Sequence, residues 1–212
     1  MTSGAFAVVA TTREVLDRPG LGPHLLAPWE RRRLDAVRVP SRRDDVLAAR
    51  LLLRLCAARL TGRPPEAAGP AQHCPECGRD GHGRPRLPGH PGLGVSLSHA
   101  DGLVAAAAGP GRVGVDVEPA ARRPGPLPVL RRLLPEAELR EAARHPDPGP
   151  ALLRAWVRAE ARFKAGPPGA EPVLLLEWTD RPRAAVAALA ATAPPALLPL
   201  AALPGGAAPA AG

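Results

Sequence analysis

The chain has 212 residues, of which 45% are hydrophobic and 23% charged, and its formal net charge is +8. This length allows one large domain or two small subdomains with a sizeable core. No window approaches 18 uncharged apolar residues, and the N-terminus lacks the basic start and the apolar run of a signal peptide, so we expect no membrane span, no export and a cytoplasmic location.

The positive charge alone suggests a polyanionic partner such as nucleic acid, a membrane surface or an acidic protein. However, 27 of the 28 basic residues are arginines spread along the whole sequence, which indicates a general compositional bias. The chain also has two Phe, three Trp and no Tyr, and this scarcity of stacking side chains argues against a protein that binds single-stranded nucleic acid.

The first half mixes strands with a long helical segment. Residues 6–10 are typical of a strand, and residues 30–62 are rich in helix formers, with Ser41 as the expected N-cap and Gly62 as the stop. Residues 63–94 hold many Pro and Gly and predict an irregular loop. Residues 94–109 then predict a strand, a turn at 100–102 and a second strand.

The second half repeats the mixture without a visible sequence repeat. Residues 112–119 predict a short strand, residues 129–143 and 150–165 predict helices, and residues 173–190 predict a closing hairpin. The tail from about residue 194 is rich in Ala, Pro and Gly, and we expect its end to be disordered. Since no regular βαβ alternation is present, the expected fold class is α+β.

The strand "GVDVE" carries a pair of carboxylates. Side chains alternate along a strand, so Asp116 and Glu118 share one face while Val115 and Val117 point into the core. Two carboxylates on one face can share a hard divalent cation such as Mg²⁺. The simpler interpretation is an amphipathic strand with a solvated acidic face.

The helical segment around residue 160 contains the only lysine of the chain, Lys164. Trp156, Glu160 and Lys164 follow one another at i, i+4 and i+8, close to one stripe of a helix. Glu160 could add a third carboxylate to a cation, and Lys164 a compact positive charge. The simpler interpretation is an exposed Glu–Lys pair that stabilises the helix by about 0.2–0.5 kcal/mol.

Two further motifs carry polar side chains. In "SLSH", Ser98 and His99 can bind phosphate oxygens, although such a pair often makes only a turn hydrogen bond. In "HGRP", Gly83 allows a close backbone approach, and Arg84 can stack or contact phosphate.

The three cysteines do not suggest disulfides, because their number is odd and only Cys74 and Cys77 are close. "CPEC" with His73, His82 and His90 nearby suggests at most three obvious zinc ligands, whereas a structural site needs four. Free loop thiols are the alternative. Cys56, within an apolar helix, is expected in the core.

Taken in order, these motifs resemble a known family. G-R-P at 83–85, S-L-S-H at 96–99, G-V-D-V-E at 114–118 and W-x-x-x-E-A-x-x-K at 156–164 resemble the 4′-phosphopantetheinyl transferases, over roughly residues 30–166. The resemblance is to the long, pseudo-dimeric type that acts on polyketide and non-ribosomal peptide synthetases. It implies transfer of the phosphopantetheine arm of coenzyme A to a serine of an apo carrier protein, with release of adenosine 3′,5′-bisphosphate.

The resemblance also implies roles for individual residues. Asp116, Glu118 and Glu160 would hold Mg²⁺, Glu160 would act as the base and Lys164 would contact the diphosphate. The other expected coenzyme A contacts are Arg33 at the 3′-phosphate, Ser98 and His99 at phosphates, and Arg84 and Pro85 at the adenine. Arg33 precedes Arg50 of "ARLLLR" by seventeen residues.

The resemblance further implies a monomer of two similar α+β halves in a pseudo-two-fold arrangement, about residues 1–105 and 106–212, with the active site between them. One departure is Ala159, where the family usually has lysine. A third hypothesis, based on Ala159, is therefore a degenerate transferase that binds carrier protein without turnover. The competing class is a basic nucleic-acid-binding module with a zinc knuckle at "CPEC", whereas the transferase reading implies no nucleic-acid partner.

Overall fold

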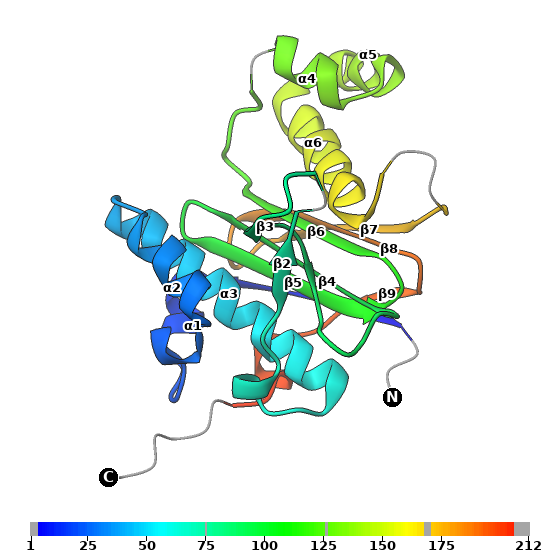
Figure 1. Ribbon diagram of the computed structural model, residues 1–212. Coiled ribbons are helices and arrows are strands. Elements are labelled where there is room, and N and C mark those ends of the chain that lie inside the picture. The colour runs from blue at the N-terminus through cyan, green and yellow to red at the C-terminus, as the bar shows by residue number, and fades with distance from the viewer. Residues whose placement is uncertain (1–3, 75, 126, 168–170, 206–212) are drawn as a thin grey trace, which may run out of the picture.

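Two β-sheets lie face to face between two layers of helices in the computed structural model (Figure 1). The structure describes residues 4–74, 76–125, 127–167 and 171–205. The mixture of helices with mainly antiparallel sheets confirms the α+β class. Among the described residues, no helix combines the length and the apolar character needed to cross a membrane.

The first sheet has the strand order β2-β3-β4-β5-β1-β9. Its elements and the helices beside it are β1 (Ala5–Thr11), α1 (Thr12–Leu16), η1 (Pro23–Leu25), α2 (Pro28–Asp35), α3 (Pro40–Thr61), η2 (Pro65–Ala67), β2 (Ala71–His73), β3 (Asp80–Arg86), β4 (Leu93–Ala100) and β5 (Leu103–Pro110). Strands β4 and β5 form the expected hairpin, turning at Asp101 and Gly102, which both have positive φ.

The second sheet has the order β6-β8-β7, with all pairs antiparallel. Its elements, with the helices that cover it and the last segments of the chain, are β6 (Val113–Pro119), α4 (Leu127–Leu133), α5 (Glu136–Arg144), α6 (Pro148–Ala165), β7 (Leu174–Asp180), β8 (Ala185–Ala191), β9 (Pro195–Leu197) and η3 (Leu200–Ala202). The predicted strand at 112–119, the helix at 150–165 and the closing hairpin are confirmed. The helix predicted at 129–143 is instead divided into α4 and α5, because Pro135 interrupts it and stands as the N-cap of α5.

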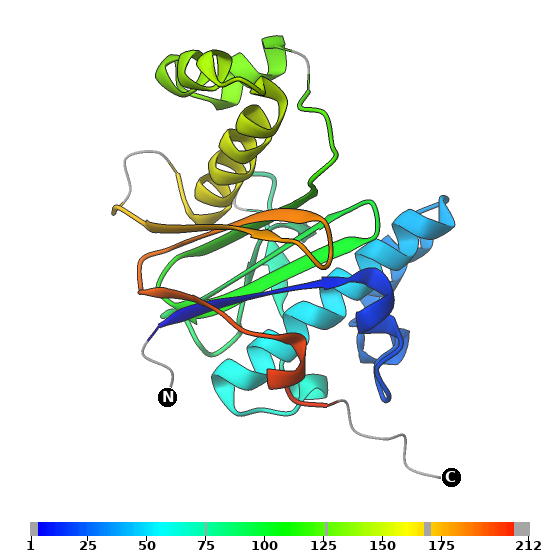
Figure 2. The ribbon, with the colours of Figure 1, turned by 180° about the vertical axis from the view of Figure 1, so that it is seen from behind.

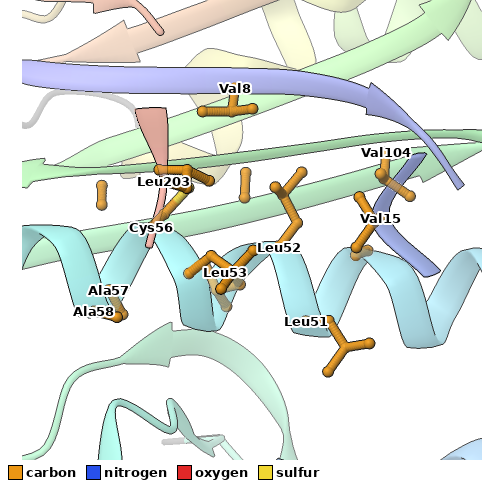
Figure 3. Close-up of a cluster of buried hydrophobic side chains, with 14 of the residues drawn as sticks. Val8, Val15, Leu51, Leu52, Leu53, Cys56, Ala57, Ala58, Val104 and Leu203 are labelled. Atoms are coloured by element: carbon orange, nitrogen blue, oxygen red, sulfur yellow. The ribbon is translucent and has the colours of Figure 1, made fainter. Parts of the chain in front are cut away.

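Helix α3 covers the outer face of the first sheet. Its start and end follow local rules, since Pro40 occupies its first turn and Gly62 ends it in the left-handed conformation at φ 70°. The N-cap is Val39, so the expectation of Ser41 was wrong by two residues. Figure 3 shows side chains of α3, among them Leu52 and Cys56, converging on Val8 of β1.

The core continues between the two sheets. Strand β1 is buried on both faces: Phe6, Val8 and Ala10 pack toward α3, while Ala5, Ala7 and Val9 pack toward the second sheet. A strand buried on both faces reads as an unbroken apolar run, which is what residues 5–10 are. On the far side, α6 covers β8 through Leu153, Val157 and Ala161 among others.

Two sequence expectations need correction. Residues 63–94, expected as irregular loop, contain the hairpin of β2 and β3, in which Gly78, Gly81 and Gly83 adopt positive φ within and beside the short strands. The tail is ordered as far as residue 205: β9 pairs in parallel with β1, and Leu203 is buried in the core (Figures 2 and 3). Residues 206–212, where disorder was expected, lie outside the described residues.

The first and second parts of the chain connect their strands and main helix in the same order. In sequence order, β1, α3 and the hairpin β4–β5 form one unit, in which β1 pairs antiparallel with β5. The same order and pairing recur in β6, α6 and the hairpin β7–β8, in which β6 pairs antiparallel with β8. The division expected at 105/106 falls inside β5, and the turn between the two units is at residues 111–112.

Candidate active site

Strand β6 carries two buried carboxylates. Val115 and Val117 face the first sheet and are almost fully buried, so alternation turns Asp116 and Glu118 to the opposite side, toward α6. Asp116 is only 4% exposed and Glu118 7%. The interpretation of a solvated acidic face was therefore wrong, and buried carboxylates need partners.

Helix α6 lies directly against β6 at Gly114. A Cβ atom at this position would collide with the backbone of Ala161 and of Ala165, so only glycine permits the contact. The close approach brings the last turns of α6, with Glu160 and Lys164, beside Asp116.

Lys164 joins three elements at Asp116. Its Nζ donates to Asp116 Oδ1 at 2.6 Å and to Ser98 Oγ of β4 at 3.0 Å. The Ser98 hydroxyl in turn donates to the same Oδ1 at 2.7 Å. The interpretation of Lys164 as half of an exposed pair with Glu160 was wrong, because its carboxylate partner is Asp116.

Negative charge is crowded around this group. Burial raises the pKa of Glu118, and so does the neighbouring Asp116, although Arg122 lowers it by donating to the Glu118 carboxylate at 2.6 Å. Burial and Asp116 likewise raise the pKa of Glu160, while Lys164 lowers it. Three carboxylates thus share a site with one lysine and one arginine, and the remaining excess of negative charge favours an added cation.

The donor set fits a hard divalent cation. Asp116 Oδ2 is buried and has no hydrogen-bond partner, and carboxylate oxygens are the ligands that Mg²⁺ prefers. Within the described ranges, the oxygens of Asp116, Glu118 and Glu160 do not all lie within 4.8 Å of one another. Lys164 and Arg122 hold two of these carboxylates in their present positions.

A cleft of about 1370 Å³ opens beside this cluster. It brings together five of the six residues that the family resemblance assigns to coenzyme A: Arg33, Arg84, Pro85, His99 and Lys164. Ser98 and the carboxylates do not line it, but Ser98 and Asp116 are bonded to Lys164 at its wall. The cleft therefore leads to the carboxylate cluster through the lysine.

The lining of the cleft is strongly basic. Its arginines are Arg33, Arg38, Arg42, Arg50, Arg84 and Arg86. Glu76 is its only carboxylate among the described residues. The sequence analysis did not single out Arg38, Arg42 or Arg86, because arginine is so frequent that no single one stands out. Such a cleft suits a ligand with several negative charges.

Individual contacts fix several of these side chains. Arg84 donates to the backbone oxygen of Phe163 on α6 at 2.8 Å, and its guanidinium lies 5.9 Å from the Phe163 ring. Arg33 donates to the backbone oxygen of Gly81. Burial lowers the pKa of His99, which favours a neutral imidazole in the absence of an anion.

A buried ion cluster lies beneath the cleft. Glu30, fully buried on α2, accepts hydrogen bonds from Arg50, at 2.9 Å, and from Arg54. The Arg50 guanidinium also lies 5.0 Å from the Trp29 ring. This cluster was not anticipated, since nothing in the sequence distinguishes Glu30 from a surface glutamate of α2.

Two residues of the W-x-x-x-E motif have a packing role. Trp156 packs against the apolar clusters on both sides of α6. Ala159, where the family pattern has lysine, packs against the cluster formed with α4 and α5. The departure from the pattern therefore coincides with an apolar contact.

Of the three cysteines, Cys56 is fully buried in the core, as expected. Cys74, Cys77 and His82 lie together at the end of the β2–β3 hairpin, whereas His73 pairs with Asp80 and His90 is not part of the group. Cys74 and His82 also line the cleft.

Comparison with known families gives one match. Residues 112–196 match the family model of the 4′-phosphopantetheinyl transferase superfamily. The match covers less than half of the chain. It includes Asp116, Glu118, Glu160 and Lys164, whereas the residues of the cleft from β3 and β4 lie outside it. No curated protein matches the chain.

Proposed function

We propose that the chain is a 4′-phosphopantetheinyl transferase that moves the phosphopantetheine arm of coenzyme A to a serine of an apo carrier protein. The observation that carries this proposal is the basic cleft ending at Lys164, behind which the buried Asp116 has one unpartnered oxygen. Coenzyme A is a polyanion with a diphosphate, so it matches both the charge and the cluster. The family match over residues 112–196 supports the same chemistry.

The arginines and Lys164 would position coenzyme A. Arg33 is exposed at the rim and is assigned to the 3′-phosphate, while Arg84 and Pro85 are assigned to the adenine. Ser98, His99 and Lys164 then face the phosphates. Lys164 is already held by two hydrogen bonds, so its charge is fixed before the substrate arrives, and fixed charges stabilise a transition state most effectively.

Asp116, Glu118 and Glu160 are assigned as the residues that would hold Mg²⁺. When bound, the ion supplies positive charge that stabilises the departing phosphate oxygens. Burial, and after it the neighbouring Asp116, raises the pKa values of Glu118 and Glu160, and a bound cation would favour their ionised forms.

Glu160 is assigned as the proton acceptor. The serine hydroxyl of the carrier protein attacks the phosphorus atom that bears the pantetheine arm, and its proton passes to the Glu160 carboxylate. The bond from that phosphorus to the bridging oxygen breaks, and adenosine 3′,5′-bisphosphate leaves with the bridging oxygen. Such transfers need positioning and charge neutralisation more than covalent help.

We further propose the long, monomeric type of transferase that serves secondary metabolite synthetases in the cytoplasm. The support is that the unit of strand, helix and hairpin occurs twice, once before and once after the turn at residues 111–112, as two halves related by a pseudo-two-fold axis would require. A single chain with both units would not need a second copy to complete its cleft. The three free cysteines agree with a reducing compartment.

Mass spectrometry tests the proposal. A set of apo carrier proteins from polyketide and non-ribosomal peptide synthetases is incubated with the purified chain, coenzyme A and Mg²⁺. The expected result is a mass gain of one phosphopantetheine on at least one carrier, absent when the carrier serine is replaced by alanine and absent with chelator. Calorimetry with coenzyme A and with duplex DNA accompanies it. No mass gain on any carrier, together with binding of DNA in preference to coenzyme A, would contradict the proposal in favour of a nucleic-acid-binding module.

A further inference from the structure

The turn at the end of the β2–β3 hairpin brings two thiols together. Within "CPECG", the Gly78 N–H donates to the Cys74 oxygen at 2.9 Å, and the Cys74 N–H donates to the Arg79 oxygen at 3.0 Å. Gly78 has φ of 67°, a conformation that a glycine adopts without strain. These features fold the backbone back on itself, so that Cys77 returns toward Cys74.

His82 completes the group from the facing strand. One ligand atom each of Cys74, Cys77 and His82 lies within 4.8 Å of the other two, and Cys77 Sγ is 3.0 Å from His82 Nε2. Ligands at about 2.0–2.3 Å from one tetrahedral zinc ion are about 3.3–3.8 Å apart. The three atoms therefore need only small side-chain rotations to bind one ion.

From this geometry we propose that Cys74, Cys77 and His82 bind a zinc ion that fixes the β2–β3 hairpin to form one wall of the cleft. Two sulfur ligands and an imidazole favour zinc and disfavour Mg²⁺, which prefers oxygen ligands. The site is chemically distinct from the carboxylate cluster of Asp116. The fourth position is left to solvent, because Cys74 and His82 line the cleft.

The β2–β3 hairpin is joined to the rest of the first sheet by few backbone contacts, so a bound ion would add to its restraint. Among the described residues, β3 pairs with β4 only at Arg86 and Gly94, so few ladder contacts hold the hairpin to the sheet. Gly83, Arg84 and Pro85 follow His82 directly and line the cleft. An ion bound to His82 would restrain these residues and with them the contact of Arg84 to Phe163. Zinc binding itself does not depend on the proposed transferase activity.

Metal content is the first test, on the full chain purified without chelators or affinity metals. About one zinc per chain is expected in the wild type, and less than about a tenth of that in the double variant Cys74→Ser with Cys77→Ser. His82→Ala should also lose most of the zinc. The control is His90→Ala, a histidine of the β3–β4 connection outside the group, which should keep the zinc. Co²⁺ added to the metal-free wild type should give thiolate charge-transfer and tetrahedral absorption bands that the double variant lacks.

Hydrogen exchange tests the restraint. Removal of zinc should accelerate amide exchange at least about tenfold in residues 71–86 and leave β6 and β8 unchanged. The proposal is overturned if the wild type contains no zinc and gives no cobalt–thiolate bands, if Cys74 and Cys77 are found as a disulfide in freshly purified protein, or if His90→Ala loses as much zinc as His82→Ala. Unchanged exchange after zinc removal would overturn the role in fixing the hairpin. None of these readouts uses transferase activity, so they stand apart from a failure of the proposed function.

Discussion

The two units of strand, helix and hairpin have the same connections but opposite use of buried charge. Strand β1 is entirely apolar or small from Ala5 to Ala10, whereas β6, of the same length, carries Asp116 and Glu118 on the side that faces its helix. The helix of the first unit buries arginines, and the helix of the second unit brings a lysine and a glutamate to the carboxylates. One scaffold thus buries an arginine–glutamate cluster in one half and, in the other, the carboxylates assigned above to the proposed transferase site.

The two units differ in how completely the oxygens of their buried carboxylates are paired. Each carboxylate oxygen of Glu30 accepts a hydrogen bond from an arginine of α3. In the second unit, Asp116 Oδ2 has no partner, and the pKa values of Glu118 and Glu160 are raised. In the first unit the carboxylate is fully paired and the unpartnered atoms are on the arginines, at Arg50 Nε and Arg54 Nε, whereas in the second unit the unpartnered atom is a carboxylate oxygen, which is the kind of atom that binds a cation. Variants in the two units should therefore have different consequences.

The largest expected effect is on stability, from Glu30→Gln in the first unit. The amide keeps the shape but leaves Arg50 and Arg54 buried without a counter-charge, and breaking a buried pair in this way costs about 3–5 kcal/mol. Urea unfolding followed by circular dichroism measures it. Asp17→Asn, which breaks the exposed pair with Arg13, is the control and should cost less than about 0.5 kcal/mol. A loss below about 1 kcal/mol for Glu30→Gln would mean that the two guanidinium groups are hydrated.

Asp116→Asn should reverse this pattern, with a large effect on activity and a small one on stability. The amide can still accept from Ser98 but cannot neutralise a cation, so kcat/KM should fall by about 10²–10³-fold. Lys164 is partly exposed and can turn to water, so the fold should tolerate the change. The rate is measured by modification of the carrier protein. The control is Glu177→Gln, which changes a carboxylate of β7 that is bound to Arg158 of α6 and should keep the activity. Activity within twofold of wild type would remove Asp116 from the metal site.

Lys164→Arg should give a smaller loss in the same unit. The guanidinium keeps the charge but is planar and wider than the ammonium group, which fits between Asp116 and Ser98. We expect kcat/KM for coenzyme A to fall at least about tenfold, or about 1.4 kcal/mol of transition-state stabilisation. The reciprocal change Arg162→Lys is the control. Arg162 lies two residues earlier and is bound to Glu138, so this variant should keep the wild-type kcat/KM. Wild-type kinetics in Lys164→Arg would show that any cation serves at this position.

The smallest expected effect is the pH dependence of stabilisation by Mg²⁺. Without metal, the raised pKa values of Glu118 and Glu160 give stability that is present below their ordinary value of 4.5 and is lost as the pH rises through the folded values. A bound cation favours the ionised carboxylates and should offset this loss. At about five times its dissociation constant, Mg²⁺ should stabilise by about 1 kcal/mol, raising Tm by about 2–4 °C near pH 8 and by less near pH 5. Scanning calorimetry measures both shifts, and an equal shift in Asp116→Asn would contradict the assignment.

Much of the fold was accessible from the sequence, because local signals dominate where single elements bury apolar residues. The strand at residues 6–10, the hairpin turning at Asp101 and Gly102, and the stop of α3 at Gly62 follow from apolar runs and from turn and capping residues. The β2–β3 hairpin was missed because Pro and Gly dominate it. No sequence repeat was visible, because the two units share connections without sharing a residue pattern, and only the family resemblance led us to expect two similar halves.

Only part of the candidate site could be predicted from the sequence. The motifs singled out Asp116, Glu160 and Lys164, and the structure brings them together, but their partners depend on tertiary contacts. Lys164 binds Asp116, 48 residues away, and not Glu160 in the adjacent turn. The burial of Asp116 depends on the missing side chain of Gly114, which lets α6 lie against β6. Such a contact has no signature in one sequence.

The parallel pairing of β9 with β1 has a consequence for biosynthesis. The last described residues of the chain complete the edge of the sheet that contains the first strand, and Leu203 fills the core of the first unit beside α3. Arg18 and Arg59 donate to backbone oxygens in residues 200–204. During translation the first unit therefore emerges with an open edge and an unfilled core position, and it acquires its final edge and packing only when residues 195–204 have left the ribosome. The unit made first is therefore finished only after the second unit has been synthesised.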